Sequence, residues 1–182
     1  MHDNFPHQLV RLLKEQKIDV ADPVIIAKTG WTTDELATAI REHNLHETFS
    51  FVTLLIGVNN QYRGRSIENY KEEYTQLLTQ AIVFANGHTQ NVFVVSIPDW
   101  GVTPFAEGRD RQQVAKEIDG YNAACKEISL AHKCHYTDIT DSTRHNGTNH
   151  LFLAADGLHP SGKEYEIWAK RLVPSVAKAL NP

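Results

Sequence analysis

The stretch FVTLLIGVNN, residues 51–60, contains the clearest structural signal in the sequence. Residues 51–56 are almost continuously apolar, which is typical of a strand buried on both faces of a parallel sheet. Gly57 then ends the run, and the amide side chains of Asn59 and Asn60 follow directly. Because binding sites in open α/β sheets form beyond the carboxyl ends of the strands, these asparagines stand where a substrate is expected.

Strand and helix patterns alternate on both sides of this stretch. Short β-branched or apolar runs predict three further strands, at residues 24–27, 92–97 and 135–139. Helical spacing and capping residues predict helices at residues 5–16, 33–43, 66–85, 111–131 and 165–180. A capping box at Ser161 and Glu164 precedes the last helix, in which Pro174 predicts a kink. This alternation predicts an α/β fold, a three-layer α/β/α sandwich with a mainly parallel sheet of flavodoxin-like order.

Length and composition narrow the function classes. The 182 residues suit a single domain, residues 1–182. The chain has 18 Lys and Arg against 22 Asp and Glu, a net charge of −4, which argues against a nucleic-acid partner. No segment reaches the ~18 apolar residues of a membrane span. Two cysteines, Cys125 and Cys134, form no disulfide framework and favour a cytoplasmic location.

The loop before the last helix contains the best candidate for proton-transfer chemistry. Its sequence Asp156-Gly157-Leu158-His159 places a carboxylate within one turn of an imidazole. Such an Asp can fix the histidine tautomer and stabilise the imidazolium that forms during catalysis. The alternative is a purely structural turn, since Asp-Gly is common turn chemistry and Pro160 prepares a helix start.

Two other loops contain candidate ligand contacts. Gly30, followed by Trp31, lets the backbone approach a ligand and offers its N–H, although a tight turn explains the glycine equally. The Asn59 side chain can donate to a developing oxyanion, or it can satisfy the backbone of its own turn. Trp100 and Phe105 lie in the long loop of residues 98–109, where they either line an acyl or aryl pocket or cap the core.

Metal chemistry is not predicted. His132, Cys134 and His135 have the residue types of metal ligands, but no second cluster at zinc spacing completes them. His145 and His150 lie in a polar loop and are interpreted as solvated. The sequence therefore predicts no metal and no organic cofactor.

Three of these loops, in this order, resemble the sequence blocks of the SGNH hydrolases, also called GDSL esterases and lipases. Gly30 matches the block that supplies an oxyanion N–H, and residues 57–60 match the Gly-x-Asn-Asp block except at the last position. Residues 156–159 match the Asp-x-x-His block completely. The resemblance implies a serine hydrolase of small carboxylic esters or acyl groups. In it His159 is the base, Asp156 orients it, and Gly30 and Asn59 donate to the oxyanion, with Trp31, Asn60, Trp100 and Phe105 around the substrate.

Two departures from the family pattern matter. Asn60 stands where the family usually has Asp, and no Gly-Asp-Ser block, which supplies the nucleophile, occurs in the chain. The first strand of the family fold is also absent, so we expect an N-terminally truncated domain. Such a chain should have little esterase activity and lower stability than a full member of the family.

Two other functions are compatible with the sequence. A non-catalytic descendant of the same fold could bind acyl compounds or other small molecules without turning them over. An unrelated flavodoxin-like nucleotide or regulator domain is the second alternative, although the strand-end loops contain no Gly-rich phosphate cradle. The sequence specifies neither the ester used nor the oligomeric state.

Overall fold

A computed structural model of the chain describes residues 3–181, which form two compact units of interleaved segments. The first unit contains the described residues up to Val24, then Pro98–Glu117 and residues 137–181. The second contains Ile25–Ile97 and Ile118–Tyr136. Helix α5, Arg111–Ala131, runs through both units and has the predicted bounds. Whether the chain is one domain stays a prediction.

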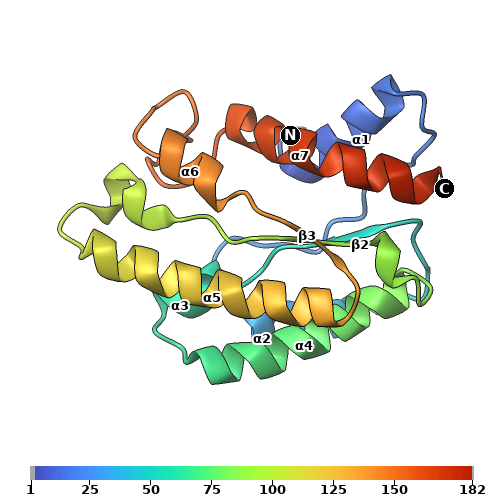
Figure 1. The fold of residues 1–182 in the computed structure, drawn as a ribbon, viewed down its shortest axis with the longest axis horizontal. Coiled ribbons are helices and arrows are strands. Elements are labelled where there is room, and N and C mark those ends of the chain that lie inside the picture. Colours follow the sequence, from blue (N-terminus) through green and yellow to red (C-terminus); the bar gives the residue numbers. More distant parts are fainter. Residues whose placement is uncertain (1–2, 182) are drawn as a thin grey trace. The chain divides into compact units, whose positions relative to one another are not determined.

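The second unit contains the sheet. Strand β1, Val52–Leu54, pairs in parallel with β2, Val92–Val95, in the register Val52 to Val92, and β3, His135–Thr137, lies on the other side of β2 (Figure 1). All four residues of β2 are buried, as expected for a central parallel strand. The predicted α/β fold with a parallel sheet is confirmed.

Two helices of this unit have the caps that the sequence predicts. Helix α2, Thr33–His43, begins at a capping box of Thr32 and Glu35, in which the Thr32 N–H donates to Glu35 Oε2 at 2.8 Å. Helix α4, Ile67–Phe84, begins at Ser66, whose hydroxyl accepts from Asn69 N. Helix α4 contacts both α2 and β1, and it buries Tyr70, Tyr74, Leu77 and Leu78.

The first unit is built on a pair of terminal helices. Helix α1, Phe5–Glu15, runs beside α7, Gly162–Leu180, although the two are far apart in the sequence (Figure 1). Leu9 and Leu13 of α1 and Leu172 and Val176 of α7 are almost completely buried. Helix α6, Thr140–Asn146, packs against α7 as well. Pro174 lies inside α7, which continues to Leu180.

Some predictions about the elements were wrong. Residues 24–27 form no strand, and Val24 and Ile25 are 59% and 39% exposed, because a β-branched run becomes a strand only with a pairing partner. The predicted strands at residues 51–56, 92–97 and 135–139 are each shorter than expected. Short helices that the sequence did not predict are α3, Val58–Tyr62, then α6, and the 3₁₀ helices Thr89–Asn91, Trp100–Val102 and Pro104–Ala106.

The predicted capping box before α7 was also wrong. Ser161 caps the helix by accepting from Lys163 N at 3.2 Å. Glu164, however, is 2% exposed and turns inward, towards α6 and Trp168. The spacing of serine and glutamate alone does not show whether the glutamate carboxylate binds the N-cap backbone or other side chains in the core.

Candidate active site

Asp156 and His159 lie in a turn between α6 and α7 and contact each other directly. His159 Nδ1 lies 2.6 Å from Asp156 Oδ2, while Asp156 Oδ1 accepts the backbone N–H groups of Leu158 and His159 at 3.0 and 2.9 Å. These hydrogen bonds, that of His159 foremost, lower the pKa of Asp156 from 3.8 to about 2. The carboxylate is therefore ionised near neutral pH and keeps a proton on Nδ1, which leaves Nε2 as the basic nitrogen.

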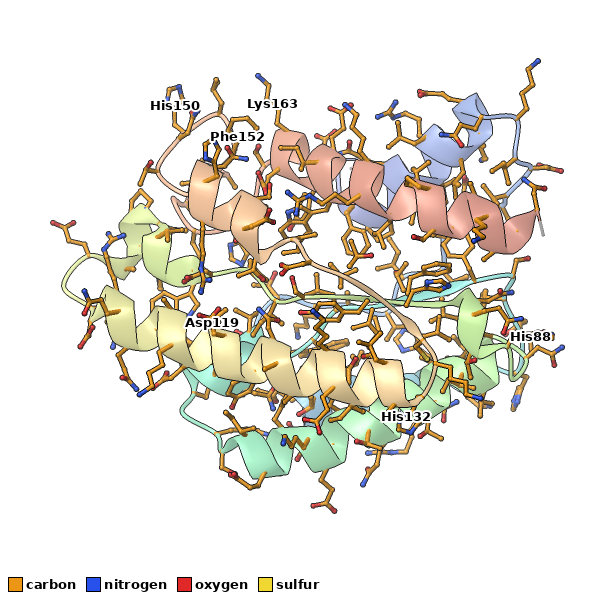
Figure 2. The ribbon with its side chains drawn as sticks, viewed as in Figure 1. His88, Asp119, His132, His150, Phe152 and Lys163 are labelled. Carbon is orange, nitrogen blue, oxygen red and sulfur yellow. The ribbon has the colours of Figure 1, made fainter. Side chains whose placement is uncertain are left out.

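The loop around this pair folds back on itself. Ala154 N donates to His159 O at 2.7 Å, and Leu153 and Pro160 form an antiparallel bridge. Gly157 adopts φ +66°, a left-handed conformation that suits the turn between Asp156 and His159. Figure 2 shows His150 pointing outward from the start of this loop, and it is exposed, in keeping with its interpretation as a solvated residue.

Glu164 joins the two helices that bracket the loop. Its Oε1 accepts the Ser142 hydroxyl at 2.6 Å and the Trp168 indole N–H at 2.9 Å, and its Oε2 accepts from Asn146 Nδ2 at 2.8 Å. Within residues 3–181 this carboxylate has no cationic partner, so three neutral donors satisfy it. Sequence reasoning missed this role because the donors are 4 to 22 positions away.

Trp100 and Phe105 form one aromatic pair in the same unit. Their ring centroids lie 6.1 Å apart in an edge-to-face arrangement, and Phe105 N donates to Gly157 O at 3.3 Å. Phe105 is 45% exposed beside the Asp156–His159 turn, whereas Trp100 is only 7% exposed. Trp100 therefore supports the loop from the core, and Phe105 presents its ring to solvent.

Three charged residues that the sequence did not single out hold the loop of residues 98–109, which contains Trp100 and Phe105. Asp99, 1% exposed, accepts from Arg144 Nε at 2.8 Å and from Gly101 N at 2.9 Å. Arg111 donates to the carbonyls of Gly101 and Thr103 at 2.8 and 3.1 Å. The position of Asp99 directly behind a buried strand was the only signal that could have pointed to it.

Gly30, Trp31 and Asn59 come together in the second unit. Asn59 Nδ2 donates to Trp31 O at 3.0 Å, which fixes the amide and leaves its second hydrogen to donate elsewhere. Gly30 adopts φ +91°, and among residues 3–181 no hydrogen bond uses its N–H. The Gly30 N–H and the Asn59 amide are thus two available donors, in two loops that are joined by the hydrogen bond from Asn59 to Trp31 O.

Gly57, directly before α3, is the position where these loops tolerate no side chain. Its φ is +129°, and a Cβ atom there would lie 2.7 Å from the ring of Tyr70. The Tyr70 hydroxyl in turn donates to Ile56 O at 3.1 Å. The close approach of Tyr70 and the left-handed backbone both require glycine.

Asn60 makes its hydrogen bonds inside the protein. It is completely buried, accepts from Thr33 N at 3.1 Å and donates from Nδ2 to Thr33 Oγ1 at 2.6 Å. Because both ends of its amide are used inside the protein, Asn60 holds the loops together. This geometry does not support the prediction that Asn60 contacts substrate.

Two arginines after α3 clamp the Gly30 loop and the start of α2. Arg63 Nη2 donates to Gly30 O at 2.7 Å, and its Nη1 lies 3.3 Å from Glu35. Arg65 pairs with Asp34 at 2.6 Å and lowers the pKa of that carboxyl from 3.8 to about 2, with help from the Thr32 hydroxyl. Neither arginine was recognised from the sequence, because the segments they join are about 30 positions apart.

The described residues contain no group of three or more His, Cys, Asp or Glu that could hold a metal ion. His132 lies just after α5 (Figure 2), and its Nδ1 is 2.8 Å from Ile128 O. His135 stacks on Phe93 with ring centroids 4.8 Å apart. Over residues 3–181, no helix is long and apolar enough to cross a membrane.

Residues 2–167 match the GDSL-like Lipase/Acylhydrolase family. The chain belongs to this family. A search of curated proteins finds no match. The GDSL-like match covers the loops of Gly30, Asn59, Asp156 and His159, and the resemblance inferred from these loops is confirmed at the level of the family.

Several solved structures share the fold of this GDSL-like chain. TesA matches with a TM-score of 0.71 and 15% identity, over 97% of this chain and 89% of its own. A lipase/acylhydrolase from Enterococcus faecalis has a TM-score of 0.72 and 19% identity, over 98% and 87%. Axe2, an acetylxylan esterase from Geobacillus stearothermophilus, has a TM-score of 0.74 and 17% identity, over 95% and 80%. At these identities the likeness shows the fold alone.

Two serines of the first unit and two of the second are engaged or buried inside the protein. In the first unit, the Ser142 hydroxyl donates to Glu164 and the Ser161 hydroxyl to Leu151 O. In the second, Ser96 and Ser129 are completely buried. Within the part of the chain that the structure describes, no serine hydroxyl bonds to the His159 ring.

Proposed function

We propose that this chain contains the acid–base pair and the oxyanion donors of an SGNH/GDSL-type serine hydrolase that acts on small carboxylic esters or acyl groups. The observation that carries the proposal is the hydrogen bond between His159 and Asp156, in which the carboxylate also accepts two backbone N–H groups. A turn needs no imidazole on its carboxylate, whereas a general base needs its tautomer fixed.

In the proposed reaction, His159 Nε2 takes the proton of a serine hydroxyl as the serine oxygen attacks the acyl carbon. Asp156 stabilises the imidazolium, and the Gly30 N–H and the second hydrogen of Asn59 Nδ2 donate to the oxyanion. His159 then returns the proton to the leaving alcohol. Water, deprotonated by His159, attacks the acyl-enzyme, and His159 returns that proton to the serine oxygen as the acid is released. None of the seven serines of this chain is assigned as the nucleophile.

The exposed ring of Phe105 is an argument that the substrate has an apolar or aromatic group. This ring adjoins the turn of Asp156 and His159 through the hydrogen bond to Gly157. The similar structures include an acetylxylan esterase, so an acetyl or other short acyl ester is the substrate class we propose. A cytoplasmic location remains a proposal, supported by two free, buried cysteines.

The test is p-nitrophenyl acetate hydrolysis by two proteins: the chain itself and the chain extended by the in-frame codons upstream of Met1. We expect little turnover by the chain alone, and turnover by the extended protein if those codons encode an apolar strand and Gly-Asp-Ser. In the active protein His159→Ala should lower the rate by about 10²–10⁴-fold. Asn59→Ala should lower kcat by about 10²–10³-fold with little change in KM. A loss below about tenfold for His159→Ala would remove it from the base role.

A second function is favoured by one observation, the absence of a serine hydroxyl at His159 among residues 3–181. In that case the chain binds acyl compounds without turnover. A short-chain carboxylate such as butyrate should then shift the NMR signals of Gly30 and His159, while the purified chain releases no p-nitrophenol. An in-frame stop codon just upstream of Met1 would support this second function over the first.

A further inference from the structure

The Asn60–Thr33–Glu73 contacts form a directional chain of hydrogen bonds beneath the two donor loops. Asn60 and Thr33 are completely buried, and the Thr33 hydroxyl both accepts from Asn60 Nδ2 and donates to Glu73 Oε2. The three residues come from three different helices, α3, α2 and α4. The contacts therefore join segments that are 27 and 40 positions apart.

The direction of these bonds determines which side chain suits position 60. A hydroxyl has one hydrogen, and an ionised carboxylate only accepts, so the Thr33 proton points at Glu73. Position 60 must then donate to the hydroxyl while it accepts from Thr33 N, and an amide does both. An aspartate at this position could only compete with Glu73 for the single proton. An amide therefore fits position 60, where the Gly-x-Asn-Asp block usually has aspartate.

Glu73 is held in place by further groups. Asn69 Nδ2 donates to its other oxygen, Oε1, at 3.0 Å, and Arg65 Nη1 lies 3.7 Å from Oε2. Arg65 is also the partner of Asp34, and Glu35 lies near enough to act on the Arg65 charge. The acceptor at the end of the chain thus has a fixed position.

The same two loops carry the proposed oxyanion donors. Asn59 precedes Asn60 in α3 and donates to Trp31 O, two residues before Thr33. The loops are therefore joined twice, once through Trp31 and Asn59 and once through Thr33 and Asn60. Because the Thr33–Asn60 contact is buried, it limits the movement of Asn59 relative to Trp31.

We propose that Asn60, Thr33 and Glu73 are positioning residues that hold the Asn59 amide on Trp31 O and beside Gly30. The inference rests on the proposed function, because it gives the oxyanion donors a supporting network. Its tests measure the Asn59 amide itself and need no turnover. A failure of these tests would leave the proposed function standing, and an inactive enzyme would leave this inference standing.

The first experiment measures hydrogen exchange of the Asn59 side-chain amide by NMR in Thr33→Val. This substitution removes the hydroxyl and keeps the branched shape. We expect exchange of the hydrogen directed at Trp31 O to accelerate at least tenfold relative to amides in β2. The matched control is Thr38→Val in the same helix, where the lost hydroxyl donates to Asp34 O and accepts from Arg41 Nη2, and exchange at Asn59 should not change. Equal acceleration at Asn59 and throughout β2 would show a merely structural role and overturn the inference.

The second experiment reverses the direction of the chain of hydrogen bonds. In Asn60→Asp, two carboxylates compete for the Thr33 proton, so Asn59 protection should fall at least tenfold near neutral pH. In the double variant Asn60→Asp/Glu73→Gln, the new amide can donate to the Thr33 hydroxyl and the new carboxylate can accept from it, so protection should return at neutral pH. Glu73→Gln alone should change little, because its carbonyl can still accept. A double variant no better protected than Asn60→Asp would overturn the inference.

Discussion

The turn of Asp156 and His159 and the loops of Gly30 and Asn59 are held in opposite ways. In the first, the pair that carries the chemistry joins near neighbours, since the imidazole and the carboxylate are three positions apart and partly exposed. The second depends on contacts between residues 27 to 33 positions apart, some of them completely buried. Damage to the turn should therefore change its chemistry and spare the fold, whereas damage to the loops should cost stability.

The largest effect is expected from Gly57→Ala, which attacks the buried side of this comparison. The new methyl group would lie 2.7 Å from the Tyr70 ring at a backbone φ of +129°. Overpacking and a strained backbone each cost about 1–3 kcal/mol, so the free energy of unfolding should fall by about 3 kcal/mol or more. Urea unfolding measures it.

Gly64→Ala is the matched control for that experiment. Gly64 also has a positive φ, +67°, but a Cβ atom there meets nothing within 4 Å. Only the backbone strain should remain, about 1 kcal/mol. If both variants lost the same stability, the Tyr70 contact would not be what requires glycine at position 57.

Glu164→Ala tests whether the Asp156–His159 turn is as self-contained as its short-range contacts indicate. The substitution strands the buried donors of Ser142 and Trp168 and the half-buried donor of Asn146. Each unsatisfied buried donor costs about 1–3 kcal/mol, and relaxation and water should bring the total loss to about 3 kcal/mol by urea unfolding. Glu164→Gln, which keeps a carbonyl for Ser142 and Trp168, should lose about half as much.

The NMR signal of the His159 ring distinguishes two outcomes of Glu164→Ala. If the turn depends only on its own contacts, the low-field Nδ1 proton shared with Asp156 persists below the unfolding transition. Loss of that signal while the protein is still folded would mean that α6 and α7 position the acid–base pair. The turn, like the loops of Gly30 and Asn59, would then depend on distant contacts.

The sequence was most informative where the contacts are local. Helices α2 and α5 have the predicted bounds because caps and apolar spacing act within a few residues. The pair of Asp156 and His159 could be recognised for the same reason, since an i,i+3 spacing across Gly157 already brings the two side chains together. The catalytic roles of these residues stay predictions.

The sequence was least informative where a residue's partner is distant. Residues 24–27 have strand composition, yet a strand exists only when another strand pairs with it. Asn60 was interpreted as a substrate contact because nothing local shows that Thr33 occupies both ends of its amide. Glu164 was interpreted as a helix cap for the same reason, since its three donors are set by how α6 and α7 pack.

A smaller effect, on the exposed side of the comparison, concerns the acidity of Asp156. His159→Ala removes the largest cause of its low pKa, so the pKa of Asp156 should rise from about 2 towards 3.8. The carboxyl ¹³C signal followed through a pH titration measures it. Because folding lowers this pKa, its contribution to stability is present above pH 3.8 and is lost as pH falls towards 2.

That contribution should be below about 1 kcal/mol, because the pair is half exposed and water screens it. Leu158→Ala is the matched control, since its backbone N–H still donates to Asp156. An Asp156 pKa that stays near 2 in His159→Ala would mean that the backbone N–H groups alone hold the carboxylate, and that the imidazole is not bound in solution.

The smallest effect is expected at Asp34, which has the same low pKa for a different reason. Its main hydrogen-bond partner is the Arg65 guanidinium, 31 positions away, and the Thr32 hydroxyl comes second. Arg65→Met should raise the Asp34 pKa from about 2 towards 3.8, seen again in the carboxyl ¹³C titration. The stability involved, about 0.5 kcal/mol or less for an exposed pair, is present above pH 3.8 and is lost as pH falls towards 2.

Lys71→Met is the control, because Lys71 contacts Glu127 only at 4.0 Å and should leave Asp34 unchanged. If Arg65→Met left the Asp34 pKa near 2, Thr32 would be the main cause. The start of α2 would then be held by neighbours in sequence, as the Asp156–His159 turn is, and the contrast between the two regions would be confined to the buried contacts of Thr33 and Asn60.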